Sequence, residues 1–417
     1  MREMKDSGIE WIGKIPASWN SHPLYYYFDE RKNRNFDLRE RNLLSLSYGN
    51  IIKKDINTTG GLLPASFNTY NIVKNLDIII RPTDLQNDKK SLRTGLVKEK
   101  IGIITSAYIA LKPREGVFSN YFHYLLHSYD IMKVFYNMGN GVRQGLNYSE
   151  FSKLILVAPS LEEQRQIADF LDQKCSEIDA LTADIQTQIE TLEEYKKSVI
   201  TEAVTKGLDP NVEMKDSGIE WCGNIPISWS SKHNKYVMSK KKVICPKYHC
   251  EKILSLTMKG VIERDLDAGG KMPSSFDGYQ FVYPNNLLMC LFDYDVTPRC
   301  IGLVEQQGLV SPAYSQFVLN DGYYAPYYYY YYLLIDNTKE LLHLAKNLRH
   351  SFTEEQLGNI NVPVPPLEEQ RKIADFLDQK CSEIDLTISE KQQQLETLAE
   401  YKKSLIYEYV TGKKEVA

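Results

Sequence analysis

The feature that most limits what this chain can fold into is a long segment that occurs twice. Residues Leu161 to Asp179 read LEEQRQIADFLDQKCSEID, and Leu367 to Asp385 read LEEQRKIADFLDQKCSEID. The two segments differ only at Gln166 and Lys372, and the copies stay in register at an offset of 206 for about 40 residues. A repeat of this length indicates a chain built from two similar structural units.

Each copy has the pattern of one long amphipathic helix. In the first copy apolar residues recur every seven positions, at Leu171, Ile178, Ile185, Leu192 and Val199. A second apolar column is predicted at Ile167, Leu181 and Tyr195, with Glu, Asp, Gln and Lys on the other faces. Ser160 and Glu163 predict a capping box at the start, and Gly207 predicts the end.

The second copy keeps an apolar stripe, although Lys391 replaces Ile185. The stripe consists of Leu377, Ile384, Ile388, Leu395, Leu398 and Leu405. A helix over residues 161–206 would be roughly 70 Å long at about 1.5 Å per residue. A helix with one apolar stripe needs a partner, so we expect the two copies to pair as an antiparallel coiled coil. A generic coiled-coil dimerisation arm is the alternative.

A second repeated segment opens each half of the chain. Met4 to Trp19 (MKDSGIEWIGKIPASW) recurs as Met214 to Trp229 (MKDSGIEWCGNIPISW) at an offset of 210. Fainter matches follow, such as LLSLSYGNIIKKD from Leu43 with ILSLTMKGVIERD from Ile253. The expected layout is unit, long helix, unit, long helix, over residues 1–159, 160–208, 209–365 and 366–417.

Each unit is predicted to mix strands and helices, which places the chain in the α+β class. Short β-rich runs such as Asp77–Ile80 and Phe317–Leu319 are separated by Gly, Asn, Asp and Pro. Helices are expected near residues 119–137 and 324–347. The second of these contains six consecutive tyrosines, Tyr327 to Tyr332. We interpret them as part of a packed helix, with a base-stacking surface as the alternative.

Composition excludes several classes of protein. No stretch approaches 18 apolar residues, and the N-terminal sequence lacks an apolar signal core, so we expect neither a membrane span nor secretion. Seven cysteines without paired spacing suit a reducing cytoplasm. Cys175 and Cys381 are expected to be buried as small apolar residues.

Charge is distributed unevenly along the chain. Residues 1–159 hold 22 Lys and Arg against 15 Asp and Glu, whereas residues 160–208 hold 5 against 11. The formal net charge of the whole chain is −4, so the total does not indicate a nucleic-acid binder. The acidic helices therefore mask a more basic first unit.

The sequence shows no pattern of a catalytic centre. It contains no Walker A motif, no GxGxxG after a predicted strand, no adenine-methyltransferase tetrad and no paired nuclease carboxylates. Cys245, His249 and Cys250 lack the usual spacing of a zinc site. We therefore expect no catalytic residue and no metal, and a self-sufficient nuclease or methyltransferase is the disfavoured alternative.

Basic clusters indicate binding instead. Lys and Arg neutralise phosphates, and Arg, Gln and Asn make bidentate contacts to base edges. Clusters recur at matched places in both halves, although any single cluster could also be a solvated charged face. The candidate DNA-binding residues are Arg31, Lys32, Arg34, Arg81, Gln86, Asn87, Lys89, Lys90, Arg93, Arg143, Lys240, Lys241, Lys242, Arg299 and Arg349.

These repeats resemble the specificity subunit of type I restriction–modification enzymes. The resemblance is carried by two copies of P-x-LEEQR-x-IADFLDQK-x-SEID with EYKKS, and by the repeated DSGIEWxGxIPxxW opening. It covers essentially the whole chain. It implies two target-recognition domains held apart by two antiparallel helices, with internal pseudo-twofold symmetry. Base-reading residues cannot be transferred one by one, because target domains of this family vary most in sequence.

The resemblance also implies partners. Each target-recognition domain would read one half of a split, asymmetric site in double-stranded DNA. The paired helices would dock two modification subunits, which bind S-adenosylmethionine and methylate adenine. Restriction subunits, which use ATP and Mg, would join them, and this chain would carry no cofactor of its own. A structural adaptor that binds only proteins is the second hypothesis, and it leaves the paired basic clusters unexplained.

Overall fold

The chain divides into two compact units. The computed structural model describes residues 2–57, 64, 66–83, 85, 92–136, 138, 145–267, 273–345 and 350–416. The first unit comprises Met1–Ile185 with Gln393–Ala417, and the second comprises Gln186–Gln392. Each unit therefore contains part of both long helices. The four-part division at residues 159, 208 and 365 stays a prediction.

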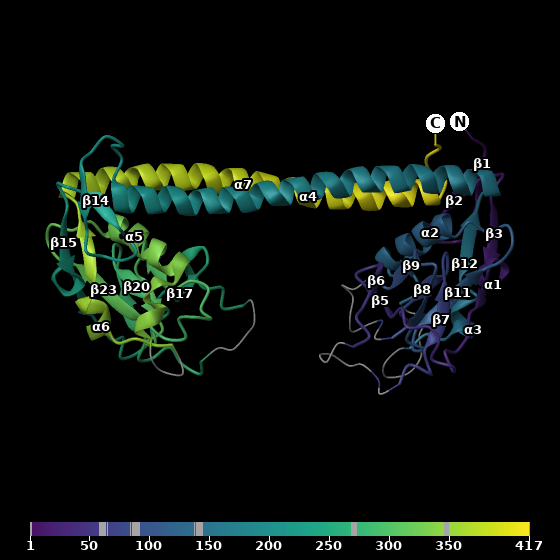
Figure 1. Cartoon of the computed structure of the whole chain (residues 1–417), viewed down its shortest axis with the longest axis horizontal. Coiled ribbons are helices and arrows are strands. Elements are labelled where there is room, and N and C mark those ends of the chain that lie inside the picture. Colours follow the sequence, from purple (N-terminus) through teal and green to yellow (C-terminus); the bar gives the residue numbers. More distant parts are fainter. Residues whose placement is uncertain are drawn as a thin grey trace. The chain divides into compact units, whose positions relative to one another are not determined.

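The first unit consists of short strands, short helices and long-helix segments (Figure 1). Its strands are β1 (Met4–Asp6), β2 (Lys14–Pro16), β3 (Asn20–Pro23), β4 (Phe28–Glu30), β5 (Leu44–Ser47), β6 (Asn50–Lys53), β7 (Asn71–Lys74), β8 (Ile78–Ile80), β9 (Thr94–Leu96), β10 (Ile101–Ile104), β11 (Ile109–Pro113) and β12 (Ile155–Ala158). Its helices are α1 (Leu24–Tyr27), α2 (Ser119–Ile131), α3 (Tyr148–Phe151), the start of α4 (Leu161–Lys206) and the end of α7 (Leu367–Val410).

The second unit repeats this order of strands. Its strands are β13 (Met214–Asp216), β14 (Asn224–Pro226), β15 (Ser230–His233), β16 (Met238–Lys241), β17 (Leu254–Thr257), β18 (Gly260–Glu263), β19 (Gln280–Val282), β20 (Leu287–Met289), β21 (Ile301–Leu303), β22 (Gly308–Val310), β23 (Ser315–Leu319) and β24 (Asn361–Val364). Its shorter helices are η1 (Asn234–Tyr236), α5 (Ala325–Thr338), η2 (Glu340–Leu344) and α6 (Glu354–Asn359).

The internal repeat predicted from the sequence is confirmed strand by strand. A four-stranded antiparallel sheet has the order β4-β11-β8-β9 in the first unit and β16-β23-β20-β21 in the second. The antiparallel pairs β1–β2, β3–β12, β5–β6 and β7–β10 match β13–β14, β15–β24, β17–β18 and β19–β22. The mixed α+β prediction is thus also confirmed for each unit.

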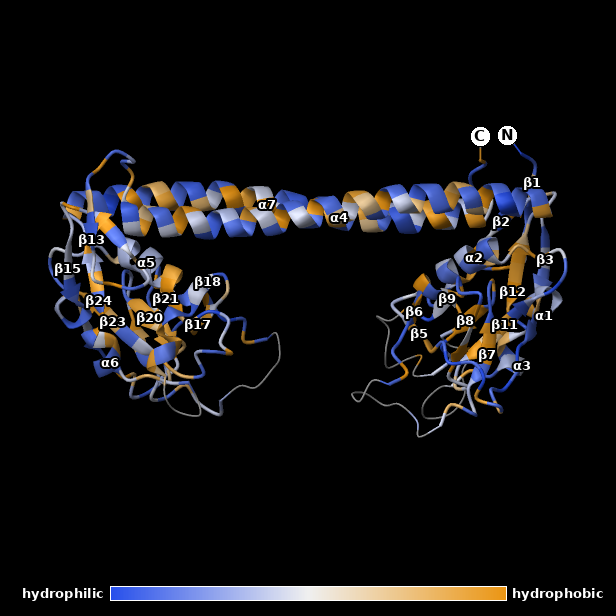
Figure 2. Ribbon diagram, in the orientation of Figure 1, coloured by the Kyte–Doolittle hydropathy of each residue, from blue (hydrophilic) through white to orange (hydrophobic). Residues whose placement is uncertain are grey.

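Strand β8 shows how the core of the first unit is divided. Its three isoleucines are fully buried, and alternate side chains point to opposite faces of the sheet. Ile78 and Ile80 pack into the main core, which includes Phe122 of α2. Ile79 faces a smaller core beneath β5, which contains Leu44. Figure 2 shows these inner strands as apolar and the surrounding loops as more polar.

The two long helices run antiparallel within each unit, as predicted. In the first unit the Phe170 and Tyr409 rings lie 4.5 Å apart, and Lys402 Nζ lies 2.6 Å from an Asp179 carboxylate oxygen. In the second unit the Lys196 ammonium lies 2.6 Å from the Asp385 carboxylate. Ion pairs at matching positions therefore fix the same register in both units.

The predicted second column of α4 is confirmed at Ile167, which is buried, but is wrong at its other two positions. Leu181 and Tyr195 are 47% and 49% exposed. The inner column instead contains Cys175, Ile189 and the partly buried Lys196. Lys196 is tolerated there because its flexible stem packs inward while its ammonium reaches Asp385. The first column is confirmed, since Leu171, Ile178 and Ile185 are buried, and so is the burial of Cys175 and Cys381.

Both ends of α4 lie where the sequence predicts, but the Glu163 carboxylate bonds outside the predicted capping box. The Glu163 backbone N–H donates to Ser160 Oγ at 3.3 Å, and Gly207 closes the helix with a φ of 76°. The Glu163 carboxylate accepts from Trp19 Nε1 at 3.3 Å and pairs with Arg2 at 2.5 Å. The repeated opening segment is thereby tied to the start of the long helix.

The tyrosine run is a packed helix, as predicted. All its members except Tyr329 are buried in the second core. Several of the hydroxyls donate inside the unit: Tyr327 to the Val204 carbonyl at 3.0 Å, Tyr328 to the Pro363 carbonyl at 3.2 Å and Tyr330 to Asp378 at 2.7 Å. A surface for stacking bases is therefore not formed by this run.

Candidate nucleic-acid interface

The segment after β8 that contains the candidates from Arg81 to Arg93 is described mainly at its two ends. Gln86, Asn87, Lys89 and Lys90 lie outside the described residues, as do the candidates Arg143 and Arg349. The loop is closed where the Arg81 backbone N–H donates to the Arg93 carbonyl at 2.9 Å.

Arg93 was predicted to contact DNA, and the structure contradicts this. Its side chain is fully buried, and Nε donates to the Tyr136 hydroxyl at 3.1 Å. A guanidinium N–H donates to the Thr83 carbonyl, and the backbone N–H donates to the Asp130 carboxylate. Arg93 therefore holds the base of the loop closed and does not face solvent. Sequence reasoning missed this because Asp130 lies on a helix 37 residues away.

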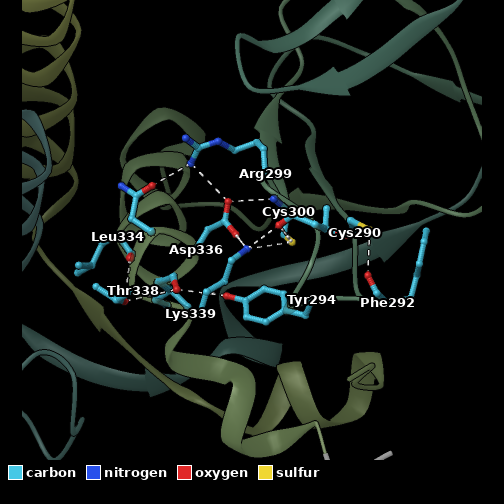
Figure 3. A network of polar contacts seen from close by, with 12 residues as sticks. Cys290, Phe292, Tyr294, Arg299, Cys300, Leu334, Asp336, Thr338 and Lys339 are labelled. Carbon is cyan, nitrogen blue, oxygen red and sulfur yellow. Dashed lines mark hydrogen bonds and ion pairs between the residues drawn. The ribbon is translucent and has the colours of Figure 1, made fainter. Parts of the chain in front are cut away.

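We call the contacts between Asp130 and Arg93 a latch. The second unit has an equivalent latch around Asp336 (Figure 3). Asp336, near the end of α5, is buried and accepts from the Cys300 backbone N–H at 2.9 Å. It also pairs with Lys339 at 2.7 Å and Arg299 at 3.3 Å. Arg299 was a candidate DNA contact, but its side chain is only 15% exposed and is committed to this network. In each unit a buried aspartate thus joins the helix end to the start of β9 or β21.

Arg31 makes an ion pair with a buried carboxylate, and its contact with DNA stays a prediction. Its guanidinium lies 2.5 Å from the Asp77 carboxylate, which is fully buried. Burial raises the pKa of Asp77, and the Arg31 side chain opposes that shift. Removing Arg31 would leave a buried carboxylate without its cation, which is unfavourable.

The remaining basic candidates lie at the surface or are half-buried. Lys32 is exposed and pairs with Glu30 at 2.8 Å, and Arg34 donates to the Thr69 carbonyl at 2.5 Å. Lys240 pairs with Glu354 at 2.5 Å, and the Lys241 ammonium lies 5.4 Å from the centre of the Tyr283 ring. Lys242 is exposed and Arg81 is half-buried. None of these six side chains is fully buried, and their contact with DNA stays a prediction.

Sequence reasoning missed a folded loop beside Arg34. The buried Asn35 donates from Nδ2 to the Glu40 carbonyl at 2.9 Å and accepts from the Glu40 backbone N–H at 3.2 Å. The loop held in this way exposes Phe36 and Arg39. An exposed aromatic residue in a polar loop was the available signal.

It also missed the tips of two hairpins. Tyr48 lies between β5 and β6 and is 80% exposed, and Met258 lies between β17 and β18 and is 61% exposed. They occupy the same position in the repeated segments LLSLSYGNIIKKD and ILSLTMKGVIERD. Bulky apolar side chains exposed at matched tips were not weighed from the sequence.

Each hairpin tip borders a cavity within its own unit. The first cavity, about 620 Å³, is lined by Tyr48, His123, His127, Cys175 and Lys402, among others. The second, about 550 Å³, is bordered by residues that include Met258 and Lys196. Burial lowers the pKa of His123 to about 3 and that of His127 to about 4, with nearby Lys98 and Lys402 acting in the same direction. Both histidines are therefore neutral near pH 7.

Among the residues that the structure describes, His, Cys, Asp and Glu form no group of three or more that could hold a metal ion. Cys245 is buried and its Sγ contacts the Lys247 carbonyl at 3.1 Å, whereas Cys250 is exposed. None of the helices within the described residues combines the length and the hydrophobicity that a membrane span requires.

Known proteins with similar sequences are described as specificity proteins of type I restriction systems. Residues 68–191 and 314–397 match the family described as "Type I restriction modification DNA specificity domain". The chain belongs to this family. The type I restriction enzyme MjaVIII specificity subunit of Methanocaldococcus jannaschii is 25% identical over 362 residues, covering 82% of this chain and 81% of that protein. MjaX, a specificity subunit assigned in the same organism, is 26% identical over 327 residues, covering 73% and 70%.

Solved structures share the fold of this specificity subunit. A chain described under "Structural basis underlying complex assembly and conformational transition of the type I R-M system" gives a TM-score of 0.71 at 13% identity, covering 96% of this chain and 99% of that one. The HsdS subunit from Thermoanaerobacter tengcongensis gives 0.51 at 13% identity, covering 96% and 98%. As a specificity subunit, the chain is the non-catalytic recognition component of a type I restriction–modification system.

Proposed function

We propose that this specificity subunit reads a bipartite, asymmetric target in double-stranded DNA, with one part read by each unit. The observation that carries the proposal is the fold-level repeat: the same sheets occur twice with different surface residues. Two similar folds with different surfaces suit two different half-sites, because base identity is read by individual side chains in the groove.

The proposal includes protein partners. The helices α4 and α7 would dock two modification subunits and, through them, the restriction subunits in the cytoplasm. S-adenosylmethionine would be held by the modification subunit, and ATP and Mg by the restriction subunit. The long exposed acidic faces of α4 and α7 support a docking role, because little of these faces is used to pair the two helices within each unit.

The test is a footprint of the assembled complex on DNA that contains the target. Adenine-methylation mapping of the host genome, with and without this gene, would first identify the target sequence. We then expect two protected patches that appear or tighten when the modification subunits are added. One continuous patch, or none, would reject bipartite reading. Equal competition by unrelated duplex DNA would reject sequence-specific recognition.

A further inference from the structure

Each unit has one β-hairpin that presents side chains rigidly at its surface. The hairpin β5–β6 turns at Tyr48 and Gly49, both with positive φ, of 46° and 80°. This is the turn geometry that matches the twist of paired strands. The hairpin β17–β18 turns at Met258, where Thr257 Oγ1 accepts from the Lys259 backbone N–H at 3.1 Å.

Glycines seat each hairpin directly on the strands below it. A Cβ on Gly95 would lie 2.6 Å from Leu46 Cδ1, and a Cβ on Gly102 would lie 2.6 Å from Leu44 Cδ1. In the second unit Gly302 and Gly308 meet Leu256 and Leu254 at 2.6 and 2.7 Å. Such close packing allows little movement, so the outer face of each hairpin is held in a fixed position.

The outer faces carry side chains suited to base edges. Strand register places Leu44, Leu46 and Ile51 on the inner face of the first hairpin. The outer face then consists of Ser45, Ser47, Asn50 and Ile52. The corresponding positions in the second hairpin are Ser255, Thr257, Gly260 and Ile262. Hydroxyls and an amide can bond to bases, an apolar side chain can contact the thymine methyl, and a two-stranded ribbon fits the major groove.

An exposed lysine lies beside each tip. The cavity beside Tyr48 is lined by Lys98, and by Lys402 and Lys403, which are held in ion pairs with Asp179 and Glu400. The cavity beside Met258 is lined by Lys259, and by four further cationic side chains that pair with carboxylates inside the unit. Lys98 and Lys259 place a positive charge where phosphates beside a groove could be contacted.

We infer that β5–β6 and β17–β18 are the ribbons that enter the major groove of double-stranded DNA, one at each half-site. Tyr48 and Asn50 would meet the bases of one half-site, and Met258 those of the other. The inference rests on the proposed function and adds the element that reads the DNA. Ser45 and Ile52 have identical counterparts in Ser255 and Ile262, whereas Tyr48 and Asn50 do not. The differing pairs therefore determine that the half-sites differ.

The test uses the full chain assembled with its modification subunits and the mapped target duplex. The double variant Tyr48→Ala with Asn50→Ala should weaken binding about 10-fold or more and relax base preference in one half-site only. Met258→Ala should do the same in the other half-site. Tyr25→Ala and Tyr236→Ala, at exposed aromatic residues outside the hairpins, are matched controls that should leave binding unchanged.

The outcomes separate this inference from the proposed function. Wild-type complex that binds no specific sequence would reject the function itself. Bipartite binding that survives all three hairpin substitutions, with base preference unchanged at both half-sites, would overturn the inference alone. Loss of assembly with the modification subunits, at an unchanged unfolding temperature, would also overturn it, because the hairpins would then be protein-docking surfaces.

Discussion

At the scale of single residues, burial decides which charged side chains can act on a ligand. Arg93, Arg31 and Arg299 carry the charge expected of phosphate contacts, yet each is bound to an aspartate or to backbone inside its unit. Exposed residues with ordinary surface partners, such as Lys32 and Lys240, stay available. Residue type alone therefore does not identify a side chain that contacts DNA.

The latch aspartates should be costly to remove. Asp130→Ala leaves the Arg93 backbone N–H and the Tyr136 hydroxyl without their buried acceptor and removes the carboxylate near the buried Arg93 cation, so we expect a loss of about 3–5 kcal/mol in the free energy of unfolding. Asp29→Ala removes one partner of the half-exposed pair with Arg114 and should cost at most about 1 kcal/mol. Urea unfolding measures both, and equal losses would contradict the structural role of Asp130.

The two cavity histidines predict an acid-sensitive first unit. Their pKa values, about 3 and about 4 when folded, lie below the ordinary value of 6.5, so neutral histidine is the folded form. Their stability contribution is present above pH 6.5 and is lost as pH falls toward 4, by at most about 2 kcal/mol each at pH 5. His123→Tyr with His127→Leu, the residues found at Tyr329 and Leu333, should flatten the pH dependence of unfolding.

At the scale of elements, helix packing is set by the partner and not by apolar residues alone. The inner column of α4 includes Thr182 and Lys196, while Leu181 faces solvent. Polar residues are accommodated because the antiparallel partner supplies carboxylates such as Asp385 beside them. A strict search for apolar heptads therefore finds one column of the seam and misplaces the other.

A matched pair of substitutions tests this register. Ile178→Ala removes a side chain that is 8% exposed, so we expect it to cost about 2–4 kcal/mol through lost burial and a cavity. Leu181→Ala, three residues away and 47% exposed, should change stability by no more than about 0.5 kcal/mol. Thermal and urea unfolding of both variants give the comparison, and a larger effect at Leu181 would contradict the assigned seam.

At the scale of the whole molecule, the net charge bears on the proposed binding of DNA. The net charge of −4 supplies little non-specific attraction, so we expect the proposed DNA binding to rely on local basic surfaces and on partner subunits. The exposed Lys241 and Lys242 form one such surface in the second unit.

Salt dependence tests the contribution of that surface. Lys241→Ala with Lys242→Ala should lower the slope of log affinity against log salt by about 1–2, because each phosphate contact contributes about 0.9. Affinity should fall by a similar factor on all target sequences. Lys174→Ala, at an exposed position on α4 paired with Glu177, is the control and should leave the slope unchanged. A slope unaffected by the double substitution would remove these lysines from the interface.

Much of the fold could be predicted from the sequence, because repetition and periodicity are local signals. The paired helices, the repeated units and the tyrosine helix were all visible in this way. The candidate interface could not be predicted as well, because the exposure of each candidate side chain depends on contacts with residues distant in sequence. Arg93 is buried by Asp130, and the exposure of Tyr48 follows from glycines in β9 and β10 that seat its hairpin.

The first unit is assembled from chain stretches that are synthesised far apart in time. Tyr121 donates its hydroxyl proton to the Val410 carbonyl at 2.9 Å, and Phe170 rests against Tyr409. At ribosomal rates of about 5–20 residues per second, roughly 10–45 s pass between residue 185 and residue 410. During this interval Leu171 and Ile178 lack their α7 partners, whereas the second unit is continuous and can complete itself first. Chaperone demand during translation should therefore concentrate on the N-terminal half.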